Sequence, residues 1–338
     1  MSNQVTLKDI AKILKVSTST VSKALNDSHE ISDYTKNNVL RIAKSLNYVP
    51  NDVARSLKSN ATKRIGVVLP NIESDFFAKV IRAIEEEAAK KNYKILISLS
   101  NDSLEKEIEG VSILFNGSVD GIIISLSQET EDLQEYSHLK NFSQRKLPVV
   151  MFDRVCNEIE CDKITIDDFE ATCTATKHLY SKGCKNIAFL STIFQTSVSK
   201  LRKDGYLKTL KELELENNLI IEIPNYNEFD AILIQHLKNN TIDAIITSDQ
   251  LSAICALKVI QENGFNVPKD ISVIGFTDGI IPQYTTPSLS IISQNEEEMG
   301  KQALNTLIQR IQEGNTETPK TFTHTVLKAN LIKRQSSL

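Results

Sequence analysis

Several features that would indicate a membrane or secreted protein are missing from the sequence. No apolar run approaches the roughly 18 residues of a membrane-spanning helix. The opening residues, MSNQVTLKD, lack the basic segment and apolar run of a secretory signal. The five cysteines are odd in number and lie in a large chain, which is typical of a reducing compartment and not of a disulfide framework. We therefore expect a cytoplasmic protein with no membrane partner.

Motifs for nucleotide or metal chemistry are also missing. Neither a G-x-G-x-x-G loop nor a G-x-x-x-x-G-K-[ST] loop occurs, and the five histidines form no catalytic cluster with Ser or Cys. Cys156 and Cys161 are neighbours in sequence, but no second cysteine pair or histidine pair accompanies them. We therefore expect no metal, no cofactor and no enzymatic activity.

The charge of the chain is divided unevenly along its length. The 338 residues suit two or three domains. Residues 1–64 carry 11 Lys and Arg against 5 Asp and Glu, whereas the rest of the chain carries 28 against 38. A basic head on an acidic body is typical of a nucleic-acid-binding arm attached to a regulatory domain.

The basic head begins with a predicted pair of short helices. Thr6 and Asp9 form a T-x-x-D capping box, which predicts a helix from Leu7. Ser17 is a suitable N-cap for a second helix over residues 18–26, and Ser32 for a third over residues 33–46. Lys15, in the break, occupies a position where a left-handed backbone would suit Gly or Asn better. Such hairpins are common, so DNA binding and a merely solvated polar face are equally good interpretations of the spacing.

The second helix would bury an apolar stripe and expose small hydroxyls and one lysine. Hydroxyl groups can bond base edges or phosphates, and lysine can reach guanine or the backbone, so this face suits the major groove. The residues that we expect on the DNA-facing surface of the head are Thr6, Leu7, Lys8, Ser17, Thr18, Ser19, Ser22, Lys23, Asn26, Ser32 and Thr35.

Three stretches decide between these interpretations: VTLKDIA, VSTSTVSKALN and NYVPNDVARSLK, at residues 5–11, 16–26 and 47–58. Together they resemble the head of the lactose-repressor (LacI/GalR) family of regulators. The resemblance implies an all-α helix-turn-helix DNA-binding domain over residues 1–50 and a hinge helix with linker over residues 51–63. In that hinge, Asn51 is the cap, Ala54 faces the partner helix and the DNA, and Leu57 is the wedge between bases.

The rest of the chain alternates short apolar runs with amphipathic helices, which predicts parallel sheets covered on both faces. The alternations are too many for one sheet, so we expect a two-lobed α/β body, like a periplasmic binding protein, with two doubly wound parallel sheets. The first lobe is expected over residues 64–162 and 292–320, and the second over residues 163–291 and 321–338. One of the helices of the first lobe is expected near residues 133–142.

Motifs in the body also resemble the effector domain of the same family, among them DGIIIS, PVVMFDR, TIDD and the R-x-x-G-Y around Gly205. The resemblance implies that a small molecule, weighted toward a sugar or sugar derivative, binds between the lobes and controls operator affinity. Ligands of open parallel sheets bind at the carboxyl ends of the strands. The expected effector-binding residues are Phe76, Phe77, Ser125, Ser127, Asp153, Arg202, Asp249 and Asp278. Each of them could instead be a helix cap, a loop residue or a core aromatic, and Asp249 fits a cap equally well.

The chain departs from the family pattern at three informative positions. Thr196 stands where purine-binding members carry an arginine, which argues against a purine effector. In the family an Asp often follows the Gly-Phe pair directly, whereas here Asp278 comes one position later. Lys23 stands where Arg or His is common, so the base preference of the operator can differ from that of other members.

Two alternative functions are a ligand-binding protein that serves transport and a nucleotide-using enzyme. The basic head opposes the first, and the missing nucleotide motifs oppose the second. The family implies a homodimeric repressor on double-stranded, pseudo-palindromic DNA, and the lack of a leucine-heptad tail predicts dimers rather than tetramers.

Overall fold

The computed structural model describes residues 5–48, 61–116, 119–140, 147–276, 279–314 and 321–337. They fall into two compact units, Met1–Thr62 and Lys63–Leu338. The predicted hinge residues Asn51, Ala54 and Leu57 and the predicted effector residue Asp278 lie outside the described residues. No helix in the described ranges has the length and apolar character needed to cross a membrane.

The head is a bundle of three helices, as the sequence predicts. Ile10, Val21 and Val39 are fully buried, one from each helix, and Leu40 is half exposed although it belongs to an apolar run. The helices are α1 (Leu7–Leu14), α2 (Thr18–Leu25) and α3 (Asp33–Ser45).

The turn between α1 and α2 has the backbone that its sequence predicts. Lys15 adopts the left-handed conformation, with φ 52° and ψ 41°, although it is neither Gly nor Asn. The backbone N–H of Thr6 donates to Asp9 at 2.9 Å, and the Ser17 hydroxyl accepts from Thr20 N–H at 3.0 Å. Local side chains therefore fix where both helices begin.

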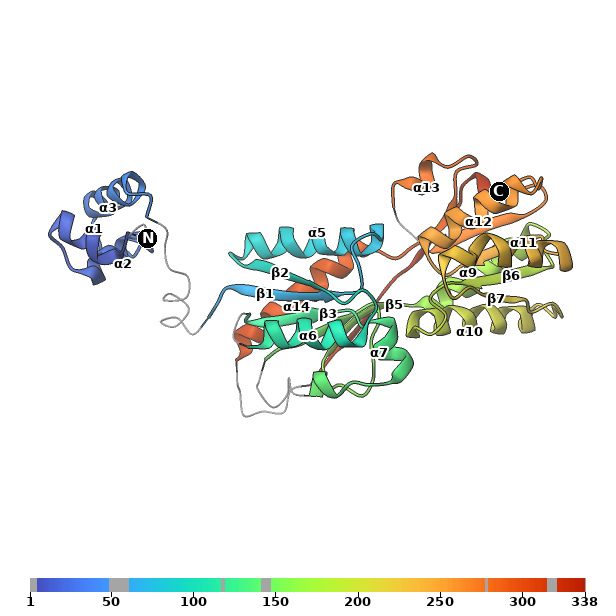
Figure 1. The fold of residues 1–338 in the computed structure, drawn as a ribbon, viewed down its shortest axis with the longest axis horizontal. Helices are drawn as coiled ribbons and strands as arrows, with labels where there is room; N and C mark the ends of the chain where they lie inside the picture. The colour runs from blue at the N-terminus through green and yellow to red at the C-terminus, as the bar shows by residue number, and fades with distance from the viewer. Residues whose placement is uncertain are drawn as a thin grey trace. The chain divides into compact units, whose positions relative to one another are not determined.

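The first lobe of the body contains a six-stranded sheet, ordered β11-β5-β4-β3-β1-β2, in which every neighbouring pair is parallel. Figure 1 shows α5 along one side of this sheet and α6 along the other. The strands are β1 (Arg64–Leu69), β2 (Lys94–Leu99), β3 (Gly121–Ile124), β4 (Val149–Phe152), β5 (Asp162–Ile166) and β11 (His324–Leu327), and the helices are α5 (Asp75–Lys90), α6 (Leu104–Phe115), α7 (Gln128–Leu133) and α14 (Glu296–Glu313).

Alternate residues of these strands enter different cores, which explains their unbroken apolar sequence. Val67 packs with residues of α5 and α14, whereas Val68 packs with Val111 and Leu114 of α6. Because side chains alternate along a strand, a sheet covered on both faces needs apolar residues at consecutive positions.

The second lobe has the same plan, with sheet order β12-β10-β9-β8-β6-β7; β12 is antiparallel to β10 and the other pairs are parallel. Its strands are β6 (Ile187–Ser191), β7 (Ile220–Glu222), β8 (Ala244–Thr247), β9 (Ser272–Phe276), β10 (Ser290–Ser293) and β12 (Asn330–Ile332). Its helices are α9 (Asp168–Ser181), α10 (Ser197–Glu212), α11 (Phe229–Asn239), α12 (Gln250–Glu262) and α13 (Ile281–Tyr284), with short 3₁₀ turns η1 (Tyr226–Glu228) and η2 (Gln335–Ser337).

The sheets correct the expected lobe boundaries. The chain passes between the lobes after β5, β10 and β11. The boundary expected at 162/163 cuts through β5, which pairs with β4 through Met151 and Lys163. The boundary at 320/321 placed β11 in the second lobe, but β11 pairs with β5 through Val326 and Thr165. The boundary at 291/292 divides β10, which pairs with β9 and β12 of the second sheet. The lobe to which each segment belongs is therefore decided by hydrogen bonding between strands that are distant in sequence.

The helix expected near residues 133–142 is also corrected. Helix α7 ends at Leu133 because Gln134 takes the left-handed conformation, with φ 53°. A further helical turn covers residues 137–140. Among the described residues, the predicted helix is therefore interrupted at residues 134–136.

Candidate functional site

The predicted DNA-facing residues of the head are accessible. Thr6, Lys8, Ser17, Thr18, Ser19, Asn26 and Ser32 are exposed, while Leu7, Ser22, Lys23 and Thr35 are partly buried. No predicted reader on this surface is fully buried.

The head residues divide into helix caps and free hydroxyls. Ser17 and Ser32 accept hydrogen bonds from Thr20 and Thr35 N–H, and the Asn26 amide donates to Ser22 O at 2.9 Å. These residues are held at helix ends. By contrast, the hydroxyls of Thr18, Ser19 and Ser22 have no hydrogen-bond partner in residues 5–48 and face solvent at the start and middle of α2, so they can bond a ligand directly.

Lys23, the one cation of α2, forms an ion pair with Glu30. Both side chains are about half exposed, at 43% and 53%. An exposed pair contributes little stability because water and salt screen it. A phosphate or a base edge can therefore replace Glu30 at small cost.

In the body, polar side chains gather at the carboxyl ends of the strands. Asp153 follows β4 and has a left-handed backbone with φ 57°. Its side chain is buried, burial raises its pKa, and its carboxyl group accepts no hydrogen bond from any described residue. A buried acceptor that no described residue satisfies is suited to a ligand hydroxyl or amine.

Arg202 lies at the centre of this region and is 2% exposed. Its Nε donates to Asp168 Oδ1 at 2.6 Å, Nη2 donates to Gln294 Oε1 at 2.8 Å, and Nη1 donates to Ser248 O. Its guanidinium also stacks on Phe276 at 3.9 Å. The structure therefore places Arg202 beside the expected site, but protein groups already occupy an N–H of each nitrogen, which leaves little for a ligand.

The buried position of Asp168 disfavours the ionised form of its carboxyl group. Burial raises its pKa to about 6, although the charge of Arg202 acts in the opposite direction. Gly205 makes this contact possible, since a Cβ there would lie 2.3 Å from Phe169 O. Only a glycine lets α10 approach the start of α9 this closely.

Hydrogen bonds between described residues join the lobes directly at two places. Ser197 N–H, at the start of α10 in the second lobe, donates to Glu131 Oε1 of α7 at 3.2 Å. Gln250 Nε2, at the start of α12, donates to Asp75 Oδ2 of α5 at 2.9 Å. Glu131 is 5% exposed. Burial raises the pKa of Glu131 to about 7, partly offset by its bond to Ser197 and the charge of Arg154.

Several buried polar atoms near the lobe boundary have no hydrogen-bond partner among the described residues. They are Oγ of Ser125, Oε2 of Glu131, Oγ of Ser197 and Oε1 of Gln250. They come from both lobes: Ser125 follows β3, and Glu131, Ser197 and Gln250 themselves form the bonds described above. Unsatisfied buried polar atoms are rare in folded proteins and indicate groups that a ligand or water completes.

Some predicted effector residues serve the protein itself. Phe76 and Phe77 are 7% and 4% exposed and pack in the core at the start of α5, edge to face. The Ser127 hydroxyl caps α7 through Thr130 N–H at 3.2 Å. Asp249 caps α12 and accepts bonds from Ser252 N–H and Oγ, Thr192 Oγ1 and Tyr226 Oη.

Sequence reasoning missed five residues at the lobe boundary. Arg154 and Asp168 belong to the quoted PVVMFDR and TIDD motifs, so their position after strands was an available signal. Glu131, Ser197 and Gln250 begin or line helices with no distinctive motif. Their importance arises from contact between lobes.

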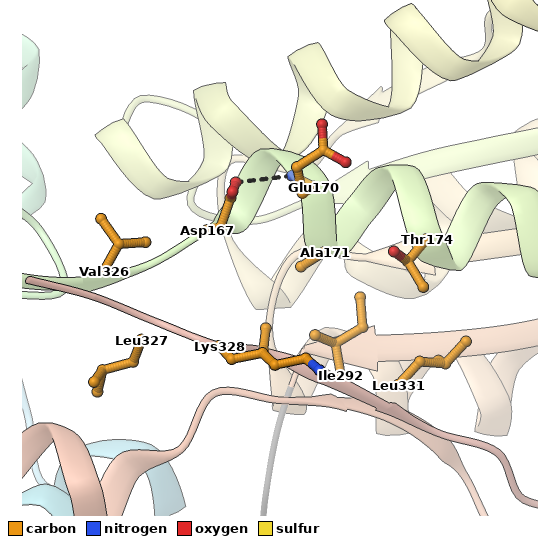
Figure 2. A pocket seen from close by; sticks show the side chains of 10 residues that line it. Asp167, Glu170, Ala171, Thr174, Ile292, Val326, Leu327, Lys328 and Leu331 are labelled. Atoms are coloured by element: carbon orange, nitrogen blue, oxygen red, sulfur yellow. Dashed lines mark hydrogen bonds between the residues drawn. The ribbon is translucent and has the colours of Figure 1, made fainter.

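A separate pocket of about 370 Å³ lies beside the segments that pass between the lobes. Figure 2 shows Asp167, Glu170 and Lys328 at this pocket, with the Asp167 carboxylate bonded to Glu170 N–H at 3.0 Å. Its remaining lining is mostly aliphatic, and it contains none of the predicted effector residues. It is therefore distinct from the polar region around Arg202.

Comparison with known proteins accounts for both parts of the chain. Residues 6–51 match the family described as "Bacterial regulatory proteins, lacI family", and residues 176–337 match the "Periplasmic binding protein-like domain". The chain is 32% identical over 341 residues to the HTH-type transcriptional repressor PurR of Glaesserella parasuis serovar 5 (strain SH0165), covering 98% of both. It is also 32% identical over 337 residues to the ribose operon repressor of Haemophilus influenzae (strain ATCC 51907 / DSM 11121 / KW20 / Rd), again covering 98% of both.

Solved structures show the same fold. A crystal structure of the lac repressor dimer bound to operator and the anti-inducer ONPF aligns with a TM-score of 0.86 at 24% identity, covering 99% of this chain and 100% of that chain. The helical head and the two-sheet body therefore occur together in a known architecture. The chain belongs to the lacI family of bacterial regulatory proteins, and it is a DNA-binding transcriptional repressor controlled by a small molecule, not an enzyme.

Proposed function

We propose that this protein is a cytoplasmic, homodimeric repressor that binds a pseudo-palindromic operator and responds to a sugar-like molecule held between its lobes. The observation that carries the proposal is the set of unsatisfied buried polar atoms contributed by both lobes, including those of Ser125, Glu131 and Ser197. A polyhydroxyl ligand has many donors and acceptors, so it can satisfy these atoms from both sides at once.

The residue at position 196 and its hydrogen bonds favour a sugar over a purine as the effector. Its hydroxyl donates to Ile193 O at 2.8 Å and accepts from Ser199 N–H at 3.3 Å, so it serves as the cap of α10. The family resemblance associates an arginine at this position with purine binding, and none is present. The relative named for the ribose operon carries a sugar in its name.

The head supplies the DNA side of the proposal. The free hydroxyls of Thr18, Ser19 and Ser22 and the exchangeable pair of Lys23 make α2 the recognition helix. Leu57 is proposed as the wedge at the operator centre. Leu57→Ala should weaken operator binding far more than non-specific binding, and equal losses would argue against the wedge.

Exposed apolar side chains provide a surface for the homodimer. Leu251, Ile280, Ile281 and Tyr284, at the start of α12 and around α13, are 49%, 62%, 46% and 78% exposed. Exposed apolar side chains of this kind are typical of interfaces.

Analytical ultracentrifugation tests this surface. Tyr284→Asp should convert the dimer to a monomer, whereas Tyr180→Asp, on an exposed part of α9, should leave the dimer intact. Monomeric wild-type protein at micromolar concentration would contradict the proposed assembly.

The function is tested by selecting duplexes from a random pool with the full-length protein and measuring affinity for the selected operator with and without sugars. Ribose, glucose, galactose and their amino derivatives form a suitable panel. At least one should change operator affinity by about fivefold or more, the usual scale of allosteric coupling. Asp153→Asn should weaken the response, whereas Asp132→Asn, on the exposed side of α7, should preserve it. No response to any sugar would overturn the sugar assignment.

A further inference from the structure

The charged groups at the lobe boundary are unequal in number. The described side chains whose charges act on one another there are Asp102, Glu131, Asp153, Asp167, Asp168, Arg154 and Arg202. Five of them are carboxyl groups and two are guanidiniums. When all are ionised, three negative charges remain uncompensated in this set.

Both guanidiniums already have protein partners. Arg202 donates to Asp168, Ser248 O and Gln294. Arg154 Nη1 donates to Asp102 Oδ1 and to Leu126 O. A phosphate or carboxylate on the effector would have to compete with these partners, or use the remaining N–H groups, while facing the excess of carboxyl groups. An anionic effector is therefore disfavoured.

Glu131 offers the opposite kind of site. Its Oε1 accepts from Ser197 N–H of the second lobe, so the carboxyl group faces the lobe boundary. Its Oε2 is buried and has no hydrogen-bond partner among the described residues. A carboxyl group that is 95% buried, with one oxygen bonded and one open, is prepared for a charged donor.

On the basis of the function proposed above, we propose that the effector is an amine-bearing polyhydroxyl compound, such as an amino sugar, and that its ammonium group binds Glu131. An ammonium supplies three donors and one positive charge, which the Glu131 Oε2 atom and the excess of carboxyl groups both require. A neutral sugar would satisfy the hydrogen bonds but leave the charge unbalanced. The raised pKa of Glu131 agrees, since burial outweighs the charge of Arg154 and favours a proton on the carboxyl group until a further cation binds.

The test compares matched ligands on the full-length protein. Glucosamine, galactosamine and mannosamine are compared with glucose, galactose, mannose and neutral N-acetylglucosamine by thermal shift and calorimetry at pH 7, where the amino sugars are mostly protonated. At least one amino sugar should bind about tenfold or more tightly than its parent, the scale of one charge-assisted bond. N-acetylglucosamine should bind no better than glucose, because its amide nitrogen carries no charge.

Two variants test whether Glu131 causes the preference for the amino sugar. Glu131→Gln should reduce the preference for the amino sugar to about threefold or less, because only the charge is lost. Asp132→Asn removes an exposed charge from the same helix and should keep the full preference. Ligand-free unfolding of both variants, measured first, shows that each is folded.

The outcomes separate this inference from the proposed function. Equal binding of neutral and amino sugars would overturn the amine assignment and leave the sugar-responsive function standing. A preference that survives Glu131→Gln would overturn the role of Glu131. Failure of every sugar in the panel to bind would overturn both proposals.

Discussion

Arg202 Nε lies 2.6 Å from Asp168 Oδ1, and both side chains are about 98% buried. Asp168 begins α9 directly after the chain leaves the first lobe, and Arg202 belongs to α10. Arg202 also reaches Gln294, which follows β10 where the chain returns. One guanidinium thus connects two of the segments that pass between the lobes, so movement of the lobes must act on this pair.

Removing one partner of this pair should be strongly destabilising, because it leaves a buried charge without compensation. Arg202→Ala is expected to lower the free energy of unfolding of the body by about 3–5 kcal/mol, measured by urea denaturation. Lys208→Ala, which removes an exposed ion-pairing side chain from the same helix, should change it by less than about 1 kcal/mol. Similar small losses for both would show that the pair is not important to stability.

Gly205→Ala should disturb the same region through its backbone. The added Cβ would lie 2.3 Å from Phe169 O, so α10 must move away from α9. We expect a loss of about 1–3 kcal/mol in the free energy of unfolding, together with weaker effector binding, because Arg202 moves with the helix. Lys200→Ala, at an exposed position of α10, is the control. An unchanged melting temperature for Gly205→Ala would contradict this packing.

The stability of the body should fall as pH rises through the range in which its buried acids ionise. Burial raises the pKa of Glu131 from 4.5 to about 7 and that of Asp168 from 3.8 to about 6. The folded protein therefore binds more protons than the unfolded chain between roughly pH 4 and 7. The stabilisation is complete below the unfolded pKa values and is lost as pH rises through the folded ones.

Glu131→Gln should remove about half of this dependence, because the shift at Asp168 is nearly as large. The shift at Glu131 corresponds to roughly 3 kcal/mol, so the advantage of the variant over the wild type should grow between pH 5 and pH 8. Denaturant midpoints at several pH values measure it. A constant difference across that range would place the titration elsewhere.

In the head, two serines of α2 should separate stability from recognition. Ser17→Ala removes the cap that Thr20 N–H uses and should lower the stability of the head by about 1 kcal/mol. Ser19→Ala removes a hydroxyl with no partner in the described head and should leave stability unchanged while weakening operator binding. Thermal melting and fluorescence anisotropy, applied to both variants, distinguish these effects. The reverse pattern would show that Ser19 supports the fold.

The outline of the fold follows from local signals that the sequence contains. Capping residues such as Ser17 fix helix starts, and consecutive apolar residues such as Val67 and Val68 indicate sheets covered on both faces. The lobe boundaries could not be predicted in this way. The place of β11 depends on pairing with β5, a strand about 160 residues earlier, which no local pattern encodes.

The candidate site was predictable in part. Asp153 directly follows β4, Arg202 lies in α10 within the R-x-x-G-Y motif, and both are near the lobe boundary, whereas Phe76, Phe77 and Asp249 are held by the fold. Glu131 could not be found because its role depends on Ser197, which is distant in sequence and lies in the other lobe. Burial with an unpaired oxygen is a property of the packed lobes and has no sequence motif.

The central claim is that effector and operator binding are coupled, and linkage gives its most direct test. Operator affinity is measured with and without the sugar that stabilises the protein most, and affinity for that sugar is measured with and without operator. The account predicts that both affinities change by the same factor, of about fivefold or more. A sugar that binds between the lobes but leaves operator affinity unchanged would contradict it.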